Sequence, residues 1–449
     1  MKTYVKDMTV GNPTKLLLSF MLPMVVGNIF QQFYNMVDSM IVGKYVGADA
    51  LAAVGATGSL NFLIFSLCGG MSNGIGIIIA QYFGAGHGEG VKKAIANAVY
   101  IMAVAATVMC LIGVFLARPL LAFLHTPADI LDASALYMQI MSVGIFAVAL
   151  YNCIAAVLRA VGDSKTPLYF LIVASILNVI LDLLFVRAFH MGVAGVGIAT
   201  IIAQLLSGIG SLVFAMAKNP YFKIEKEHMR VQKDIISQCI RMGVPLAFQS
   251  SLIAISCVAL QSVVNTFGSV VVAAFTATGR IEQLVQQPYN SLGMAVSTYT
   301  GQNMGAGKID RVKQGFRKAS LMMAIFSFVM LPLAYFGGEF IMKLFVNEAE
   351  VIEMGSQALR ITSWFYLFLG FIYVARGLLN GAGDAAFAFA NGLVEMAGRI
   401  CLAKPLTMIP GVGVWGVWLA TALTWFITGI VSVLRYLQGK WKKDALKNV

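Results

Sequence analysis

The sequence predicts an all-α polytopic membrane protein with twelve transmembrane helices in two six-helix bundles. Three observations carry this prediction: the composition, the number of long apolar runs, and an internal repeat. The 449 residues are 59% hydrophobic and only 12% charged, and the mean hydropathy is +0.81. Soluble domains carry about 25% charged residues. The composition therefore excludes an ordinary soluble enzyme, a disordered chain and a disulfide scaffold.

Twelve apolar runs come near the ~20 residues needed to cross a bilayer. The expected spans are roughly 14–42, 51–82, 94–117, 134–157, 167–188, 194–217, 236–265, 270–298, 316–337, 355–379, 385–409 and 414–437. Of the 32 Lys and Arg residues, 24 lie on the side of the N-terminus, six on the opposite side and two within spans. By the positive-inside rule, both termini are expected in the cytoplasm. The net charge of +12 is thus mainly a topology signal, and no nucleic-acid partner is expected.

Four sequence blocks repeat at one offset of 221 residues. The clearest pairs are Leu158…Gly162-Asp163 with Leu379…Gly383-Asp384, and Gly195-Val196…Ala199-Thr200 with Gly416-Val417…Ala420-Thr421. Each repeat holds six spans, an even number, so the two halves insert with the same orientation about a pseudo-two-fold axis along the membrane normal. We expect an N-lobe at 1–217, a charged cytoplasmic linker at 218–235 and a C-lobe at 236–449. Paired repeats of this kind are typical of secondary transporters.

Ionisable side chains deep in a membrane are costly, so each is a functional hypothesis. In the first half, Asp38, Tyr137, Asn178, Asp182 and Thr200 lie on four spans at similar depth in the outer half of the membrane. Asn178 and Asp182 share a helix face at i,i+4. These oxygens predict a site for H⁺, or for Na⁺ held by Asp38, Asn178, Asp182 and Thr200. Two carboxylates close together in low dielectric should not both stay ionised. The alternative is that both aspartates only cap or pack helices.

The second half lacks this set, because the positions 221 residues after the two aspartates are Ala259 and Ala403. It carries Glu282 near the middle of span eight, and Glu395 with Arg399 at i,i+4 on span eleven. These three residues are candidates for substrate binding. A structural intrahelical ion pair is the alternative for the last two.

Two prolines interrupt equivalent spans. Pro23 lies inside the first span and Pro245 is its counterpart in the seventh. A mid-helix proline removes a backbone hydrogen bond and kinks the helix. The kinks are either static or points of bending during transport.

The run Gly381-Ala382-Gly383-Asp384 resembles the GxGD signature of intramembrane aspartyl proteases. The equivalent Gly162-Asp163 lies in an expected inner loop, and no Tyr-Asp partner lies in a span, so we interpret both as turns that close helix hairpins. No GxxxxGK[ST] loop is present. We expect no enzyme activity and no cofactor beyond a coupling ion.

The chain resembles the multidrug and toxic compound extrusion (MATE) family over nearly its whole length. The resemblance rests on Met8-Thr9-Val10-Gly11, the Pro23 helix ending in Asp38, the 42–47 turn, Ala52-Ala53-Val54-Gly55 and the 158–163 loop. It implies a V-shaped pair of bundles that exports organic, often cationic and aromatic compounds in exchange for H⁺ or Na⁺. In the prokaryotic branch with an N-lobe site, the family's cation-binding residues fall on Asp38, Tyr137, Asn178, Asp182 and Thr200. Pro23 falls on the bending proline and Gln31 on a drug-contacting position, and we group Tyr34 and Asn35 with Gln31. Span seven has no acidic residue, unlike branches with a C-lobe cation site.

The sequence therefore predicts a monomeric, cation-coupled antiporter for small organic molecules in the cytoplasmic (inner) cell membrane. The main alternative is a flippase for lipid-linked oligosaccharides or another lipid. That activity would call for a strongly cationic cavity, whereas only Arg280 and Arg399 lie near the middle of an expected span. A membrane-embedded protease and a channel remain as further alternatives.

Overall fold

The computed structural model describes residues 5–124 and 126–444, and all regular structure in these ranges is helical. The outer ends of the predicted lobes 1–217 and 236–449 lie outside the described residues. The helices are α1 (Pro13–Ile41), η1 (Val42–Val46), α2 (Ala48–Gly84), α3 (Gly88–Phe123), α4 (Ala128–Val143), α5 (Ile145–Ala160), α6 (Lys165–Leu183), η2 (Leu184–Ala188), α7 (Gly192–Lys218), η3 (Pro220–Phe222), α8 (Lys233–Val264), η4 (Asn265–Phe267), α9 (Ser269–Gly305), α10 (Ile309–Lys343), α11 (Ala349–Ser363), α12 (Tyr366–Gly381), α13 (Ala385–Met408), η5 (Gly413–Trp415), α14 (Gly416–Gln438) and α15 (Trp441–Asp444).

Each expected span corresponds to one helix or to one bent pair of helices. Among the described residues, nine helices are long and apolar enough to cross a membrane, and two bent pairs raise the number to eleven. The bends are 44° between α4 and α5 and 54° between α11 and α12, where the sequence predicted single unbroken spans. The helix outside this set, α9, has 37 residues but carries polar side chains including Glu282, Gln283 and Gln286. These side chains reduce its apolar character without shortening it.

The repeat is visible in the backbone. Four glycines of the first half have positive φ angles, and so do the four glycines 221 residues later: 47 with 268, 86 with 307, 162 with 383, and 192 with 413. Residues with a side chain rarely adopt this backbone region. The bend between α4 and α5 likewise recurs at the same register between α11 and α12. The two halves therefore share one set of turns, which makes them copies of one architecture.

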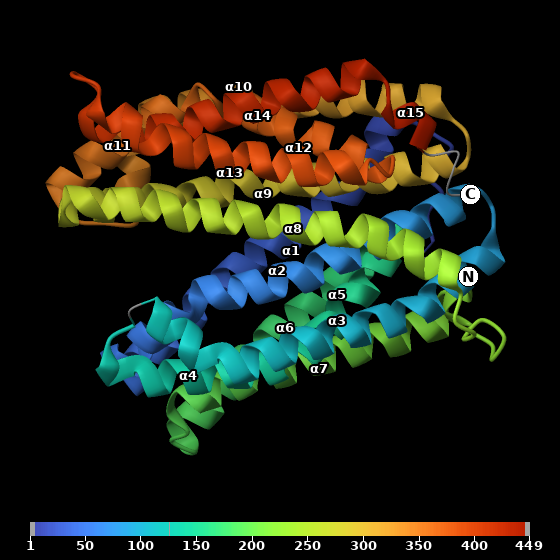
Figure 1. The fold of residues 1–449 in the computed structure, drawn as a ribbon, viewed down its shortest axis with the longest axis horizontal. Helices are drawn as coiled ribbons and strands as arrows, with labels where there is room; N and C mark the ends of the chain where they lie inside the picture. Colours follow the sequence, from blue (N-terminus) through green and yellow to red (C-terminus); the bar gives the residue numbers. More distant parts are fainter. Residues whose placement is uncertain (1–4, 125, 445–449) are drawn as a thin grey trace. The chain divides into compact units, whose positions relative to one another are not determined.

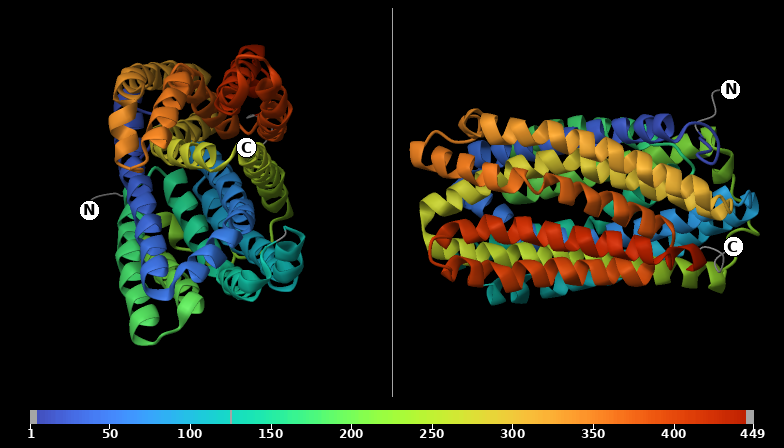
Figure 2. Two further views of the ribbon diagram at one scale, coloured as in Figure 1. Left: turned by 90° about the vertical axis from the view of Figure 1, so that its left-hand side faces the viewer. Right: turned by 90° about the horizontal axis from the view of Figure 1, so that it is seen from above.

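By their contacts, the residues form two units. The first comprises residues 1–7 and 22–247, and the second comprises residues 8–21 and 248–449. The linker 218–235 thus belongs to the first unit, while the predicted lobe boundary there stays a prediction. Within each unit the long helices run side by side, α2 to α7 in the first and α9 to α14 in the second (Figures 1 and 2).

The chain changes unit inside two helices. The beginning of α1 belongs to the second unit and the rest, from Leu22, to the first. The beginning of α8 belongs to the first unit and the rest, from Phe248, to the second. Each change lies within three residues of the proline in that helix, Pro23 or Pro245.

Each unit has an apolar core and an apolar exterior. Ile75, Ile79 and Met138 are among the buried residues of the first core, and Trp418 is among those of the second. Large side chains also stand on the outside, and Phe115 and Phe336 are 73% and 79% exposed. Such a surface would be unfavourable in water but matches lipid tails. The exterior therefore agrees with the membrane location predicted from composition.

Candidate functional site

The two aspartates singled out in the sequence meet inside the first unit. Asp38 lies near the end of α1 and Asp182 near the end of α6, and their carboxyl groups lie close to each other. Asp182 is fully buried and Asp38 is half-buried. One Oδ1 atom on each is buried without a hydrogen-bond partner among the described residues. The site therefore has free acceptor capacity, which is unusual for a buried polar group.

Asn178 and Thr200 support this pair. One turn before Asp182, the Asn178 amide nitrogen donates to Asp182 Oδ2 at 3.1 Å when the amide is oriented to satisfy its neighbours. The amide oxygen then accepts from Thr200, at 3.1 Å from its backbone nitrogen and 3.3 Å from its hydroxyl oxygen. The i,i+4 spacing that the sequence showed is thus used to hold the buried carboxylate in place.

Two tyrosines complete the surroundings. The Tyr34 hydroxyl lies close to Thr200 and within electrostatic reach of both aspartates. Tyr137, which is buried on α4, is also within reach of both. The structure therefore brings together all five predicted cation-site residues, and it adds Tyr34, which the sequence assigned only to substrate contact.

Both aspartates precede irregular helical turns. Asp38 stands one turn before the π-helical η1, and Asp182 stands two residues before the π-helical η2. Turns of this type are rare and often mark functional sites. The equivalent end of α8 forms the 3₁₀ turn η4 instead. Beside the pair, Tyr137 packs in a small apolar cluster with Val42, Val186 and Val196.

The remaining predicted residues of α1 do not join this network. Gln31 is half-buried and Asn35 is exposed. Within the described parts of the chain, neither side chain forms a hydrogen bond. Both stay candidates for contact with a transported molecule.

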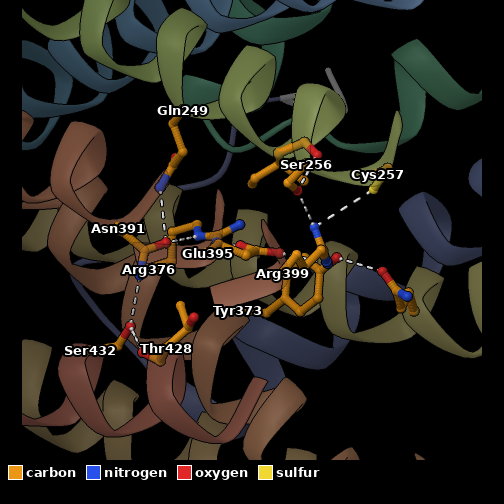
Figure 3. A network of polar contacts seen from close by, with 12 residues as sticks. Gln249, Ser256, Cys257, Tyr373, Arg376, Asn391, Glu395, Arg399, Thr428 and Ser432 are labelled. Carbon is orange, nitrogen blue, oxygen red and sulfur yellow. Dashed lines mark hydrogen bonds and ion pairs between the residues drawn. The ribbon is translucent and has the colours of Figure 1, made fainter. Parts of the chain in front are cut away.

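The second unit holds a different network, built around Glu395 (Figure 3). Glu395 Oε1 accepts from Arg399 Nη2 at 3.0 Å, and Oε2 accepts from Arg376 Nη2 at 2.8 Å. All three side chains are at most 15% exposed. The predicted i,i+4 pair exists, but its carboxylate is shared by a second arginine from α12. Two cations and one anion leave this trio with a net positive charge.

Polar side chains from other helices satisfy the remaining donors. Arg399 Nη1 donates to Ser256 Oγ at 2.8 Å, and Arg376 Nε donates to Asn391 Oδ1 at 2.9 Å. Asn391 continues the network to Gln249 and Ser432 (Figure 3). Sequence reasoning missed Arg376 as a partner. The available signal was its place inside the expected span 355–379, where a lone cation needs a counter-charge.

Glu282 lies next to this network. Its carboxyl lies near Thr362 and within electrostatic reach of the Arg399 guanidinium. Glu282 Oε1, Thr362 Oγ1 and the Tyr366 hydroxyl are buried atoms without a hydrogen-bond partner elsewhere in the described chain. The second unit therefore also has unused polar capacity, located at the break between α11 and α12.

The GxGD-like residues have structural partners. Asp163 Oδ1 accepts from the backbone nitrogens of Lys165 and Thr166, both at 3.0 Å, at the start of α6. Asp384 caps α13 in the same way and holds Arg435 at 2.7 and 3.0 Å. Burial raises the pKa of the Asp163 carboxyl, and the hydrogen bonds from Thr166 and Lys165 oppose this effect. Both aspartates close hairpins, as the turn interpretation predicted.

The fold and its two repeats define a polytopic membrane transporter with paired six-helix units. Comparison with known proteins agrees. The MatE family model matches residues 23–184 and 245–402, once in each repeat. A probable multidrug resistance protein of Bacillus subtilis, YpnP, is 30% identical over 445 residues, covering 98% of both chains. A second B. subtilis relative, YoeA, also called a probable multidrug resistance protein, is 29% identical over 435 residues, covering 95% of this chain and 94% of its own.

Solved structures show the same fold. The outward-facing structure of a multidrug resistance MATE family transporter superposes with a TM-score of 0.91 at 21% identity, covering 99% of this chain and 100% of the other. The chain belongs to the MATE family. It is a multi-pass membrane protein and a multidrug efflux transporter, and it is not an enzyme.

Proposed function

We propose that the chain is a cation-coupled antiporter that exports organic, cationic or aromatic compounds, and that the proton is its coupling ion. The observation that carries this proposal is the closeness of the buried carboxyl groups of Asp38 and Asp182 inside the first unit. An ionised carboxylate only accepts hydrogen bonds. Two carboxylates this close in a low-dielectric site do not both stay ionised, so one of them holds a proton, which the other can accept as a hydrogen bond. The pair is built to bind and release that proton.

Sodium is the second candidate ion, and one observation favours it. Asp38, Asn178, Asp182 and Thr200 present oxygen atoms to one small volume, and hard cations prefer oxygen ligands. The unpartnered Oδ1 atoms could serve as ligands. The proton remains the better fit because the two carboxyl groups already contact each other, so a proton alone satisfies them.

Coupling follows from competition for the same negative charge. An organic cation is attracted to the pair when it is ionised, and protonation removes that attraction. A ligand shifts a conformational equilibrium only when it binds the two states unequally. Proton entry would thus release the substrate and favour the state in which the pair is protonated. Gln31, Tyr34 and Asn35, on the same helix as Asp38, are the proposed contacts for the substrate.

The second unit would contribute through its buried charges. Glu282 has a free carboxyl oxygen and is the stronger candidate for contact with substrate. Glu395 and Arg399 satisfy each other and are proposed as a structural centre that fixes the position of Glu282. Pro23 and Pro245 are proposed as points of bending, because each lies where its helix passes from one unit to the other.

The proposed location is the cytoplasmic membrane, with both termini on the cytoplasmic side. The support is the four-to-one excess of Lys and Arg in the segments on that side. The proposed working unit is a monomer, because the cation-site residues all come from one chain.

The experiment is dye efflux in everted membrane vesicles, with pH and sodium gradients imposed separately. Asp38→Asn and Asp182→Asn should each abolish transport driven by the pH gradient while the protein still reaches the membrane. Asp132→Asn is the matched control, because Asp132 is an exposed loop-side aspartate paired with Arg118 at 3.1 Å. Its transport should equal that of the unmodified protein.

Two results would reject the proposal. Normal efflux by either pair variant would remove the pair from the mechanism. Transport that follows a sodium gradient and ignores the pH gradient would replace the proton with sodium at the same site.

A further inference from the structure

A separate apolar groove lies in the first unit, and of the helices that carry the ion site only α7 contributes to it. It has a volume of about 450 Å³ and is lined by α3, α5, α7 and the chain just after η3. This volume falls within the roughly 300–1,000 Å³ of ligand pockets. Its walls are almost wholly apolar, with Met102, Ala106 and Ile154 buried at the base. At its rim, Val99 and Met216 are 63% and 54% exposed, so the groove opens to the lipid-facing surface.

One end of the groove is charged. Lys223 is the only charged residue in its lining, and it lies between Phe222 and Ile224, which also line the groove. Within residues 5–124 and 126–444, Lys223 forms no ion pair. Its ammonium group is exposed and available at the end of an apolar channel.

The loop that carries Lys223 is anchored to the helices. The Tyr100 hydroxyl donates to the backbone oxygen of Met229 at 2.8 Å, and the backbone nitrogen of Gln232 donates to Asn97 at 2.9 Å. His228 contacts Glu89 at 2.6 Å. The loop is therefore fixed against α3 at residues 228–232, after Lys223. These contacts hold the loop next to the groove that Lys223 lines.

We propose that this groove binds an anionic phospholipid of the bilayer, with an acyl chain along the apolar walls and the phosphate group at Lys223. Three properties together select this ligand. The groove faces lipid, its walls match a hydrocarbon chain, and its charged end complements a negative headgroup. Basic pockets between transmembrane helices on the cytoplasmic side bind anionic headgroups in this way. The site is distinct from the aspartate pair and does not depend on which ion drives transport.

The test is lipid binding to the purified full-length protein, measured by native mass spectrometry in detergent. The added probes are phosphatidylglycerol and phosphatidylcholine with the same acyl chains. We expect one saturable phosphatidylglycerol site. Lys223→Gln should weaken it about fivefold, the equivalent of about 1 kcal/mol for one lysine at an anionic surface. Lys226→Gln is the matched control, because this exposed lysine lies on the same loop outside the groove lining.

A second pair of variants tests the apolar part. Ala103→Trp fills the groove and should abolish saturable binding of phosphatidylglycerol. Val104→Trp adds the same side chain at the next position, which is 65% exposed and outside the lining, and should leave binding unchanged. Both positions are exposed, so folding is preserved and is checked by gel filtration.

Three outcomes would overturn the proposal. Equal loss with Lys223→Gln and Lys226→Gln would mean diffuse attraction to a basic loop. Equal binding of phosphatidylcholine would mean that the headgroup is not recognised. Unchanged binding in Ala103→Trp would mean that the lipid lies elsewhere.

Discussion

Glu395 should control the stability of the second unit. Among the described residues, its carboxylate is the only acidic group that forms ion pairs with Arg376 and Arg399, and all three side chains are at most 15% exposed. Glu395→Gln preserves the shape of the side chain and removes its charge. Two guanidinium groups would then be left in a buried site without the carboxylate that pairs with both. Breaking a buried pair costs about 3–5 kcal/mol, much more than the pair contributes over an apolar replacement.

The expected loss for Glu395→Gln is at the lower end, about 3 kcal/mol, because the amide oxygen still accepts one hydrogen bond. For a unit of roughly 200 residues, 1 kcal/mol changes the melting temperature by about 2–4 °C. The expected decrease is therefore about 6–12 °C. The assay is thermal unfolding of the purified protein in detergent, followed by tryptophan fluorescence. Trp418 and Trp425 are buried in this unit and report on its packing.

The chain offers a matched control at Glu339. It forms an i,i+4 ion pair with Lys343 at 2.7 Å, which is shorter than the 3.0 Å between Glu395 and Arg399. Both members of the Glu339–Lys343 pair are exposed, however. Exposed pairs contribute little, because water and salt screen them. Glu339→Gln should therefore leave the melting temperature unchanged. Equal melting temperatures for Glu395→Gln and Glu339→Gln would refute the reasoning, because the loss of stability is expected to depend on the burial of the ion pair and not on its length. Adding Arg376→Gln to Glu395→Gln should recover part of the loss.

Three further predictions concern turns and kinks. Asp384→Ala should be less stable than Asp384→Asn by about 1 kcal/mol and should melt at a lower temperature, since asparagine still caps α13 while both variants lose the ion pair with Arg435. Equal melting temperatures would contradict the capping role. Gly162→Ala should destabilise by about 1–3 kcal/mol, because φ is +89° and an added Cβ would collide with a backbone carbonyl oxygen, and denaturant-induced unfolding measures this cost. Pro23→Ala and Pro245→Ala restore a helical hydrogen bond, so each should raise the melting temperature and slow dye efflux; unaltered efflux in both would make the kinks static.

The fold was predictable because transmembrane helices can be recognised in a sequence by the length and the apolar composition of their segments. Every backbone polar group must be satisfied inside the segment, which leaves few alternatives to a helix. The breaks after Val143 and Ser363 were not predicted. Each interrupts a continuous apolar run, so hydropathy carries no trace of it. Their recurrence at one offset shows that the shared architecture, and not a local breaker residue, determines them.

The candidate site was predictable to a different extent in the two units. In the first, Asn178 and Asp182 share a helix and Asp38 is a rare charge, so depth and spacing sufficed to group them. In the second, the pairing of Glu395 with Arg376 joins two helices at no fixed spacing. Contacts of that kind depend on how helices rotate against each other, which a single sequence does not encode in a readable pattern.

The comparison of the two repeats explains how one architecture supports two chemistries. The positions of Asp38 and Asp182 become Ala259 and Ala403, so the second unit loses the acidic pair while keeping the turns and bends. The second unit instead has Glu282 at the position equivalent to Asn61 of the first, beside the break between α11 and α12. A carboxyl group there has a free oxygen but lies within reach of the Arg399 guanidinium, whereas the described neighbours of the pair in the first unit are hydroxyls and an amide. Charge exchange with a proton is therefore proposed for the first unit, where no described cation competes for the carboxylates.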